Sequence, residues 1–139
     1  QRIFDKDLSG EIYIDLKFEK IIQENIRTLV HKNLINSAHD ISIGGLMSAI
    51  ILCCEQNNLG AKIDKKIPEN WAGSLFGEDQ SRIIFSYDEE NKKEISKLLN
   101  KSNWMEIGTV TEKNIKFENI FIESDSLFMS YNKGFSRDI

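Results

Sequence analysis

The segment that most constrains the fold runs from Leu46 to Gln56 and is apolar on nearly every side of a helix. It follows a glycine pair, Gly44 and Gly45, and it ends at Asn57–Gly60, whose residue types tolerate the left-handed conformation of a helix C-terminus. A helix on a protein surface would keep a polar face, so this one is expected to be buried on both faces. The rest of the chain therefore has to pack around it.

The other segments alternate between helical and extended patterns. Leu16–Asn33 is expected to form a long amphipathic helix after an N-cap at Asp15, because its apolar residues recur at helical spacing. Asp64–Ser74 is expected to be a loop. The remaining expected elements are extended segments over Asn36–Ser42, Ala61–Ile63, Arg82–Tyr87, Trp104–Val110, Asn114–Phe117 and Ile120–Ile122, a helix over Glu89–Asn100 capped by Asp88, and a last helix from Ser124 or Asp125 to Asn132, ended by Gly134.

Because helices and strands interleave, the sequence predicts an α/β (α+β) domain in which a mixed β-sheet carries helices packed on one face. The strands over Trp104–Val110 and Asn114–Phe117 are expected to form a hairpin-like pair. Residues 1–14 mix charge with Gly and Ser and are expected to be an incoming linker, which leaves 15–139 as the domain. The chain begins with Gln1, not Met, so we expect it to be part of a larger protein.

Composition excludes several classes of partner. The net charge is -4 and no basic cluster is present, which is atypical of a nucleic-acid-binding domain. The longest apolar run, Leu46–Cys54, is about half as long as a membrane-spanning helix, and the N-terminus lacks the apolar region of a signal peptide. We therefore expect no nucleic acid, no membrane and a cytoplasmic location.

The two cysteines, Cys53 and Cys54, are adjacent in the apolar helix, where their side chains point in different directions. They are expected to be buried, reduced and structural. Neither His31 nor His39 stands at a ligand-like spacing from them, so no metal site is expected.

One candidate binding segment precedes the apolar helix and contains His39, Asp40, Gly44 and Gly45. Glycines at a strand-to-helix junction let backbone N–H groups approach a ligand, and a helix N-terminus attracts phosphate. The alternative is structural: the glycines make a tight turn, and Asp40 accepts backbone hydrogen bonds within it.

A second candidate segment, Leu75–Arg82, places Glu78, Asp79, Gln80 and Arg82 at the entrance of a strand. These side chains can bind a polar ligand or a metal. Equally, Arg82 can pair with Glu78 or Asp79 and order the loop.

A third segment, Glu106–Thr111, carries no evident chemistry, and Gly108 in it is expected to mark a bulge or a close packing contact. The sequence contains no nucleophile elbow and no phosphate-binding or dinucleotide glycine motif, so no catalytic residue is expected within this chain.

In their order and spacing, the three segments resemble the C-terminal domain of the AIR synthase-related superfamily, and most closely the second such domain of the phosphoribosylformylglycinamidine synthase family. Residues 37–46 are similar to the family signature His-Asp-x-Ser-Asp-Gly-Gly-Leu, Leu75–Arg82 to its segment Leu-Phe-(Ser/Gly)-Glu-(Ser/Asp)-Gln-x-Arg, and Glu106–Val110 to its Ile-Gly-x-Val strand. The resemblance extends from about Ile14 to about Tyr131. Ile43 departs from it, because the family has an acidic residue there.

The resemblance implies an ATP- and Mg²⁺-dependent carbon–nitrogen ligase of de novo purine biosynthesis. Such enzymes convert formylglycinamide ribonucleotide to the amidine through an iminophosphate, with ammonia from a glutaminase domain or subunit. It also implies that nucleotide and metal bind mainly in preceding N-terminal domains, and that this part alone is inactive and binds no cofactor. The substrate- or nucleotide-binding candidates that it gives are Glu78, Gln80 and Arg82 as polar wall residues, and His39, Asp40, Gly44 and Gly45 in the ordering loop.

Two alternatives stay open: the same domain in a sibling enzyme of the AIR synthase or selenophosphate synthetase type, and a non-catalytic interaction domain. A domain taken from a larger enzyme is expected to expose an apolar face, through which it can dimerise.

Overall fold

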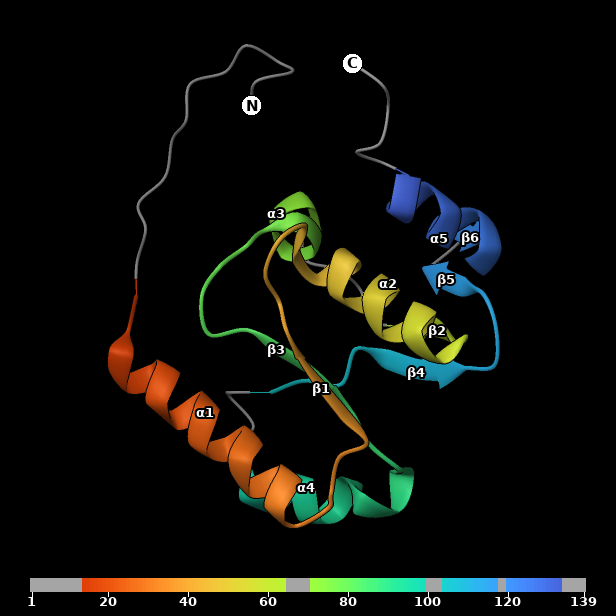
Figure 1. Cartoon of the computed structure of the whole chain (residues 1–139). Helices are drawn as coiled ribbons and strands as arrows, with labels where there is room; N and C mark the ends of the chain where they lie inside the picture. Colours follow the sequence, from red (N-terminus) through yellow and green to blue (C-terminus); the bar gives the residue numbers. More distant parts are fainter. Residues whose placement is uncertain (1–13, 65–70, 100–103, 118–119, 134–139) are drawn as a thin grey trace.

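The computed structural model describes residues 14–64, 71–99, 104–117 and 120–133 (Figure 1). The predicted linker over residues 1–14 and the predicted helix stop at Gly134 lie outside these ranges, apart from Ile14.

Helix α1, Leu16–His31, begins where the sequence predicts. The Asp15 carboxylate accepts hydrogen bonds from the backbone N–H groups of Lys17 at 2.9 Å and Phe18 at 3.1 Å, which confirms the N-cap. The C-terminal half of α1 packs against helix α4, Lys92–Leu98, as Figure 1 shows. The buried side chains of this contact are Leu29, Leu34, Ile95 and Leu99.

Helix α2, Gly45–Asn57, lies at the centre of the described structure. None of its residues from Gly45 to Glu55 is exposed, so the predicted burial on both faces is confirmed. The helix ends at Asn58, whose φ of 51° is left-handed as expected from the Asn57–Gly60 segment. Its buried residues form a core with the neighbouring strands, and the members of this core are Ile50, Ile51, Cys54, Ala61, Ile63 and Ile115.

Within the described ranges, six strands form two sheets. β1, Ser37–Asp40, pairs antiparallel with β3, Ile83–Ser86, in a two-stranded sheet. The four-stranded sheet has the order β4-β2-β5-β6, with bounds Gly108–Thr111 for β4, Gly60–Ile63 for β2, Ile115–Phe117 for β5 and Ile120–Ile122 for β6. β2 pairs antiparallel with β4 and parallel with β5, so this sheet is mixed, as predicted.

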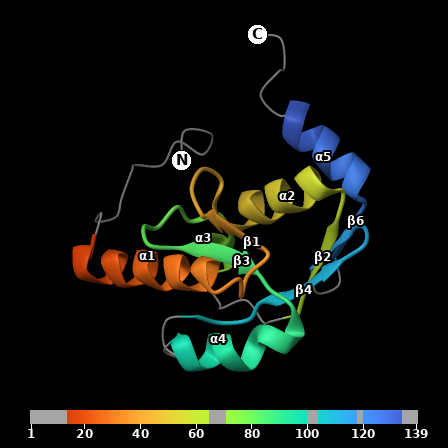
Figure 2. The same cartoon turned by 60° about the horizontal axis from the view of Figure 1, so that its bottom comes forward.

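The four-stranded sheet is covered by α2 together with helix α5, Ser124–Lys133; Figure 2 shows both helices on the same side of β2, β4 and β6. Leu127 and Phe128 of α5 pack against the core that α2 shares with the sheet. The predicted fold class, a mixed sheet with helices on one face, is therefore confirmed.

The predicted hairpin between β4 and β5 is wrong, because β2 lies between these strands. Ala61 and Ile63 are buried in β2, and a strand buried in this way needs hydrogen-bonding neighbours along both edges. Asn114, with φ at 66°, reverses the chain after β4, and its carbonyl accepts a hydrogen bond from the Ala61 backbone N–H at 3.0 Å. The chain thus leaves β4 and returns on the far side of β2.

Three smaller predictions also need correction. Of the loop expected over Asp64–Ser74, residues 65–70 lie outside the described ranges, and its last residues belong instead to a short helix α3, Trp71–Phe76, whose Leu75 is buried. The helix expected over Glu89–Asn100 starts as a 3-10 turn, Glu89–Asn91. Asp88 holds the N-cap position as predicted, but its side chain makes no capping hydrogen bond, and its carboxylate accepts one from the Asn36 amide at 3.0 Å. The strand expected over Trp104–Val110 is shorter, since only Gly108–Thr111 faces β2.

Candidate functional site

The two candidate binding segments meet at one end of the β1–β3 sheet. The antiparallel register pairs Asp40 with Ile83, so the chain leaving β1 and the chain entering β3 lie side by side. The Ile41 backbone N–H extends the pairing by donating to the Arg82 carbonyl at 2.9 Å. We call residues 39–45 and 77–82 together the β1–β3 corner.

Glu78 joins the two halves of this corner. Its Oε1 accepts a hydrogen bond from the Gly44 backbone N–H at 2.8 Å. Gly44 is the N-cap of α2 and has no side chain with which to cap it. A carboxylate at a helix N-terminus is favoured by the helix dipole, so Glu78 supplies from a distant segment the negative charge that α2 lacks locally.

Both glycines are required by their backbone conformation, and Gly45 also by the close approach of α2 to α3. Gly44 and Gly45 have φ values of 80° and 69°, in the left-handed region that favours glycine. A Cβ on Gly45 would lie 2.6 Å from the carbonyl oxygen of Leu75. The Gly45 N–H donates to the Ser42 carbonyl at 2.9 Å, which closes the tight turn. The structural interpretation of the glycine pair therefore accounts for its geometry.

Arg82 orders the second half of the corner. Its Nη1 donates to the Gly77 carbonyl at 3.0 Å and lies 3.9 Å from the Asp79 carboxylate. This matches the predicted loop-ordering pair of Arg82 with an acidic neighbour. Between Gly77 and Arg82, the residues Glu78, Asp79 and Gln80 are exposed to solvent.

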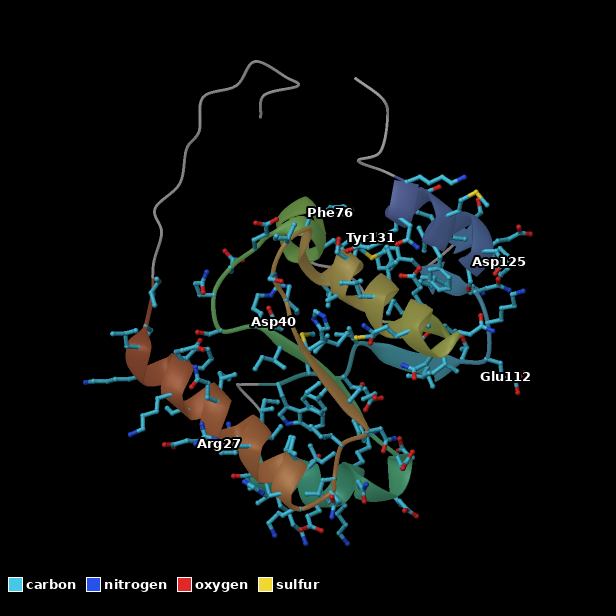
Figure 3. All side chains as sticks on the ribbon, viewed as in Figure 1. Arg27, Asp40, Phe76, Glu112, Asp125 and Tyr131 are labelled. Carbon is cyan, nitrogen blue, oxygen red and sulfur yellow. The ribbon has the colours of Figure 1, made fainter. Side chains whose placement is uncertain are left out.

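His39 and Asp40 interact with each other at the end of β1. His39 Nδ1 lies 2.6 Å from the Asp40 carbonyl oxygen and 3.8 Å from its carboxylate. The Asp40 side chain is exposed, and the backbone N–H of Gly44 in the glycine turn is taken by Glu78. Figure 3 labels Asp40 at the β1 side of the corner and Phe76 at the end of α3.

A cleft of about 910 Å³ lies beside the corner. Its walls come from α1, α2, the β1–β3 sheet and the approach to β4, and they include Phe18, Cys53, Ser81, Arg82 and Glu106. Among the predicted binding residues, Arg82 lines this cleft. Glu78, Gln80, His39, Asp40 and the glycines lie on the corner outside its lining.

Glu19 and Ser81 are residues of this site that sequence reasoning missed. The Ser81 hydroxyl donates a hydrogen bond to Glu19 Oε2, which ties the corner to α1. Gln23 donates to the other carboxylate oxygen at 2.8 Å. The hydrogen bond from Ser81, and then that from Gln23, lower the pKa of Glu19. The sequence carries no signal for this contact, because it joins a helix surface position to a loop residue far along the chain.

The third segment supports packing. A Cβ on Gly108 would lie 2.9 Å from the Ile63 Cα, so β4 approaches β2 as closely as the sequence predicts. Glu106 accepts hydrogen bonds from the Tyr87 hydroxyl at 2.8 Å and from Lys92 Nζ at 2.9 Å. Burial, and then the hydrogen bond to Glu106, raise the pKa of Tyr87 to about 12.

The cysteines are unsuited to nucleophilic chemistry. Cys54 is buried and Cys53 half-buried, and both are free thiols. Burial first, and then the neighbouring Cys53, raise the pKa of Cys54 to about 11, and burial raises the pKa of Cys53. Both thiols therefore stay protonated at neutral pH. Among the described residues, no group of three or more His, Cys, Asp or Glu side chains converges to hold a metal ion.

Within the described part of the chain, no helix has the length and apolar character needed to cross a membrane.

The family model described as AIR synthase related protein, C-terminal domain, matches residues 4–118. Among curated proteins, the chain is 29% identical over 97% of its length to phosphoribosylformylglycinamidine synthase subunit PurL of Bartonella quintana. It is 34% identical over 81% of its length to the subunit of the same name in Pelagibacter ubique. The matches span 19% and 16% of these two relatives, so the chain spans less than a fifth of their length.

A similar fold is present in solved structures of Thermotoga maritima PurL. In the complex with ATP, the match covers 86% of this chain and 23% of that chain, with a TM-score of 0.67 and 22% identity. In the complex with FGAR, it covers 79% of this chain and 21% of that chain, with a TM-score of 0.65 and 22% identity. In the PurLQS structure, the shares are 84% and 22%, with a TM-score of 0.67 and 21% identity.

Proposed function

The chain belongs to the AIR synthase related protein family, C-terminal domain, and we propose that it is the C-terminal domain of a phosphoribosylformylglycinamidine synthase. In this proposal the complete protein is an ATP-dependent ligase of purine biosynthesis in the cytoplasm. It converts formylglycinamide ribonucleotide and glutamine-derived ammonia to formylglycinamidine ribonucleotide through an iminophosphate.

The observation that carries the proposal is similarity along nearly the whole chain to curated subunits of this one enzyme. The match to the Bartonella quintana subunit covers 97% of the chain, and it includes the segments that form the β1–β3 corner. The fold shared with Thermotoga maritima PurL is consistent with it.

We propose that this domain contributes a polar wall to the substrate cleft, and that the reacting groups lie elsewhere in the protein. Arg82 lines the cleft, where its guanidinium, held by Gly77 and Asp79, can present N–H groups to a phosphate or an amide oxygen. Glu78 has a second carboxylate oxygen besides the one that binds Gly44, and Gln80 offers an exposed amide. Both can contact a ligand that extends over the corner, while His39 and Asp40 order the loop.

ATP and Mg²⁺ would supply phosphoryl transfer to the amide oxygen and charge neutralisation at that phosphoryl group. The described residues do not fit a metal site, since no three potential ligands converge, and the Gly44 N–H at the start of α2 already binds Glu78. We therefore propose that nucleotide and metal bind mainly to N-terminal domains of the same polypeptide. The likeness to the PurL chain of the PurLQS structure supports an assembly with further subunits, among which a glutaminase would supply ammonia.

The proposal predicts that activity belongs to the complete protein. With ammonium salt, ATP and Mg²⁺, the complete protein is expected to convert formylglycinamide ribonucleotide to the amidine with stoichiometric release of ADP. The 139-residue chain alone, at equal concentration, is expected to give no turnover. Product formation would be followed by coupling to the next, ring-closing step and by chromatography of the nucleotides.

Two results would contradict this function. One is ammonia-dependent turnover by the isolated chain. The other is a folded complete protein that binds ATP but leaves formylglycinamide ribonucleotide unchanged. A complete protein carrying Lys93→Ala, at an exposed position on α4 away from the corner, serves as the matched control and should keep wild-type rates.

A further inference from the structure

Ser81 holds an unusual backbone conformation at the point where the corner enters β3. Its φ is 63°, in the left-handed region that residues other than glycine adopt rarely. Such a conformation persists when surrounding contacts determine it. The contacts here are the hydrogen bond from the Ser81 hydroxyl to Glu19 and the pairing of the next residue, Arg82, with Ile41.

Glu19 is itself fixed at both ends of its carboxylate. Oε2 accepts from Ser81, and Oε1 accepts from Gln23, one helical turn further along α1, at 2.8 Å. The helix that carries Glu19 is anchored by the Asp15 cap at one end and by the contact with α4 at the other. Glu19 is therefore a rigid acceptor facing the corner.

The loop that contains Ser81 also contacts the N-terminus of α2. Arg82 closes the chain over residues 77–82 by donating to the Gly77 carbonyl at 3.0 Å. Within that closed loop, Glu78 accepts from the Gly44 N–H at 2.8 Å. The loop over residues 77–82 thus carries two hydrogen bonds, Ser81 to Glu19 of α1 and Gly44 at the start of α2 to Glu78, and through them it links α1 to α2 by residues expected to face substrate.

We propose that Glu19 is a positioning residue, which through Ser81 fixes the place of Glu78 and the polar edge of the β1–β3 corner. The geometric part of this inference stands on the contacts alone. Its consequence for substrate binding rests on the proposed function.

Backbone amide hydrogen exchange of the 139-residue chain, read residue by residue by NMR, tests the geometric part. In Glu19→Ala and Ser81→Ala, the Gly44 amide is expected to exchange about tenfold faster, because Glu78 no longer stays within reach of it. Glu19→Gln keeps an oxygen that can accept from Ser81 and should retain most of the protection. Glu24→Ala, which removes an exposed carboxylate of the same helix paired with Lys20, should change nothing.

The amides of Ile51 and Cys54, in the buried part of α2, report whether the fold is intact. Unchanged Gly44 exchange in Glu19→Ala would overturn the inference. So would an equal loss of protection at Gly44, Ile51 and Cys54, because Glu19 would then only stabilise the fold.

Steady-state kinetics of the complete protein test the consequence for substrate. Glu19→Ala is expected to raise KM for formylglycinamide ribonucleotide several-fold with little change in kcat, and Glu19→Gln to restore it. An unchanged KM, with Gly44 exchange altered, would overturn the claim that Glu19 acts on substrate binding. Absence of synthase activity in the wild-type complete protein would instead contradict the proposed function, and the exchange result would stand independently.

Discussion

Glu106 connects two parts of the chain by accepting from both Tyr87 and Lys92. Lys92 Nζ also lies 3.2 Å from Glu89, and Tyr87 packs beside Phe85 and Trp104, with ring centroids 6.0 and 6.3 Å away. The partly buried hydroxyl keeps its proton because the phenolate would lose hydration and would face the Glu106 carboxylate. The direction of the pKa shift gives this cluster a measurable pH dependence.

Stability is expected to fall between pH 10 and 12 because of Tyr87. Its pKa is raised to about 12 in the folded protein, above the ordinary value near 10. The folded state therefore holds this proton more tightly, so the stabilisation is complete below about pH 10 and is lost as pH rises toward the folded pKa. Since Tyr87 is partly exposed, we expect a loss of about 1 kcal/mol in the free energy of unfolding, less than a fully buried group would give.

Urea unfolding at several pH values, with tyrosinate absorbance followed alongside, measures this effect. Tyr87→Phe should remove the latest tyrosine ionisation and flatten the stability profile between pH 10 and 12. Tyr131→Phe, at an exposed position of α5, should leave both unchanged. A late ionisation that survives in Tyr87→Phe would contradict the assignment.

At the residue scale, the sequence predicts contacts between near neighbours and misses distant ones. The Asp15 cap and the pairing of Arg82 with Asp79 follow from residue type and short spacing. The hydrogen bonds of Glu78 with Gly44 and of Ser81 with Glu19 span 34 and 62 residues. No local pattern encodes such contacts, because they depend on how the strands pair.

At the element scale, helix α1 was predictable from its apolar periodicity and helix α2 from its continuous apolar run, since each signal is contained within its own segment. Strand positions were largely predictable for the same reason. The order of the strands was not predictable, because β2 lies between β4 and β5 through pairings with residues far along the chain. Helix α3 was missed because its six residues are too few to show a period.

The close contact of β4 with β2 gives a prediction about Gly108. An added Cβ would clash with the Lys62 carbonyl oxygen and would lie 2.9 Å from the Ile63 Cα. Both are backbone atoms, so no side-chain rotation can relieve the clash. Gly108→Ala is therefore expected to destabilise the protein by about 1 to 3 kcal/mol, as overpacking does. Chemical denaturation measures the change in the free energy of unfolding.

Thr109→Ala is the matched control, because Thr109 is the exposed neighbour on the same strand. Thr109→Ala should lower the free energy of unfolding by less than about 1 kcal/mol, the range over which strand propensities vary. Equal stability of Gly108→Ala and the wild type would show that β4 can move away from β2 without loss.

At the scale of the whole molecule, the end formed by β6 and α5 exposes apolar side chains. β6 is an edge strand of the four-stranded sheet, and Ile120 and Phe121 in it are 58% and 61% exposed. Met129 of α5 is 56% exposed. Because the chain spans less than a fifth of the length of its curated relatives, we expect other parts of a larger protein to cover such a surface.

Without those parts, the isolated chain is expected to dimerise through the β6–α5 end. Sedimentation velocity at several concentrations should show a weight-average mass that rises with concentration. Phe121→Lys is expected to keep the chain monomeric, because a charge on an edge strand opposes pairing. Leu16→Lys, at an exposed apolar residue of α1, should leave the association unchanged. A monomer at every concentration would refute the prediction.

The place of β2 in its sheet also governs the time at which this chain can fold during synthesis. Residues 60–63 leave the ribosome well before β4 and β5, which supply the neighbours on both edges of β2. Until residues 108–117 have emerged, the nascent chain holds an apolar strand with two unpaired edges next to the apolar helix α2. This topology is expected to delay cooperative folding until residues 108–117 have emerged, and to leave apolar surface of α2 and β2 exposed on the nascent chain until then.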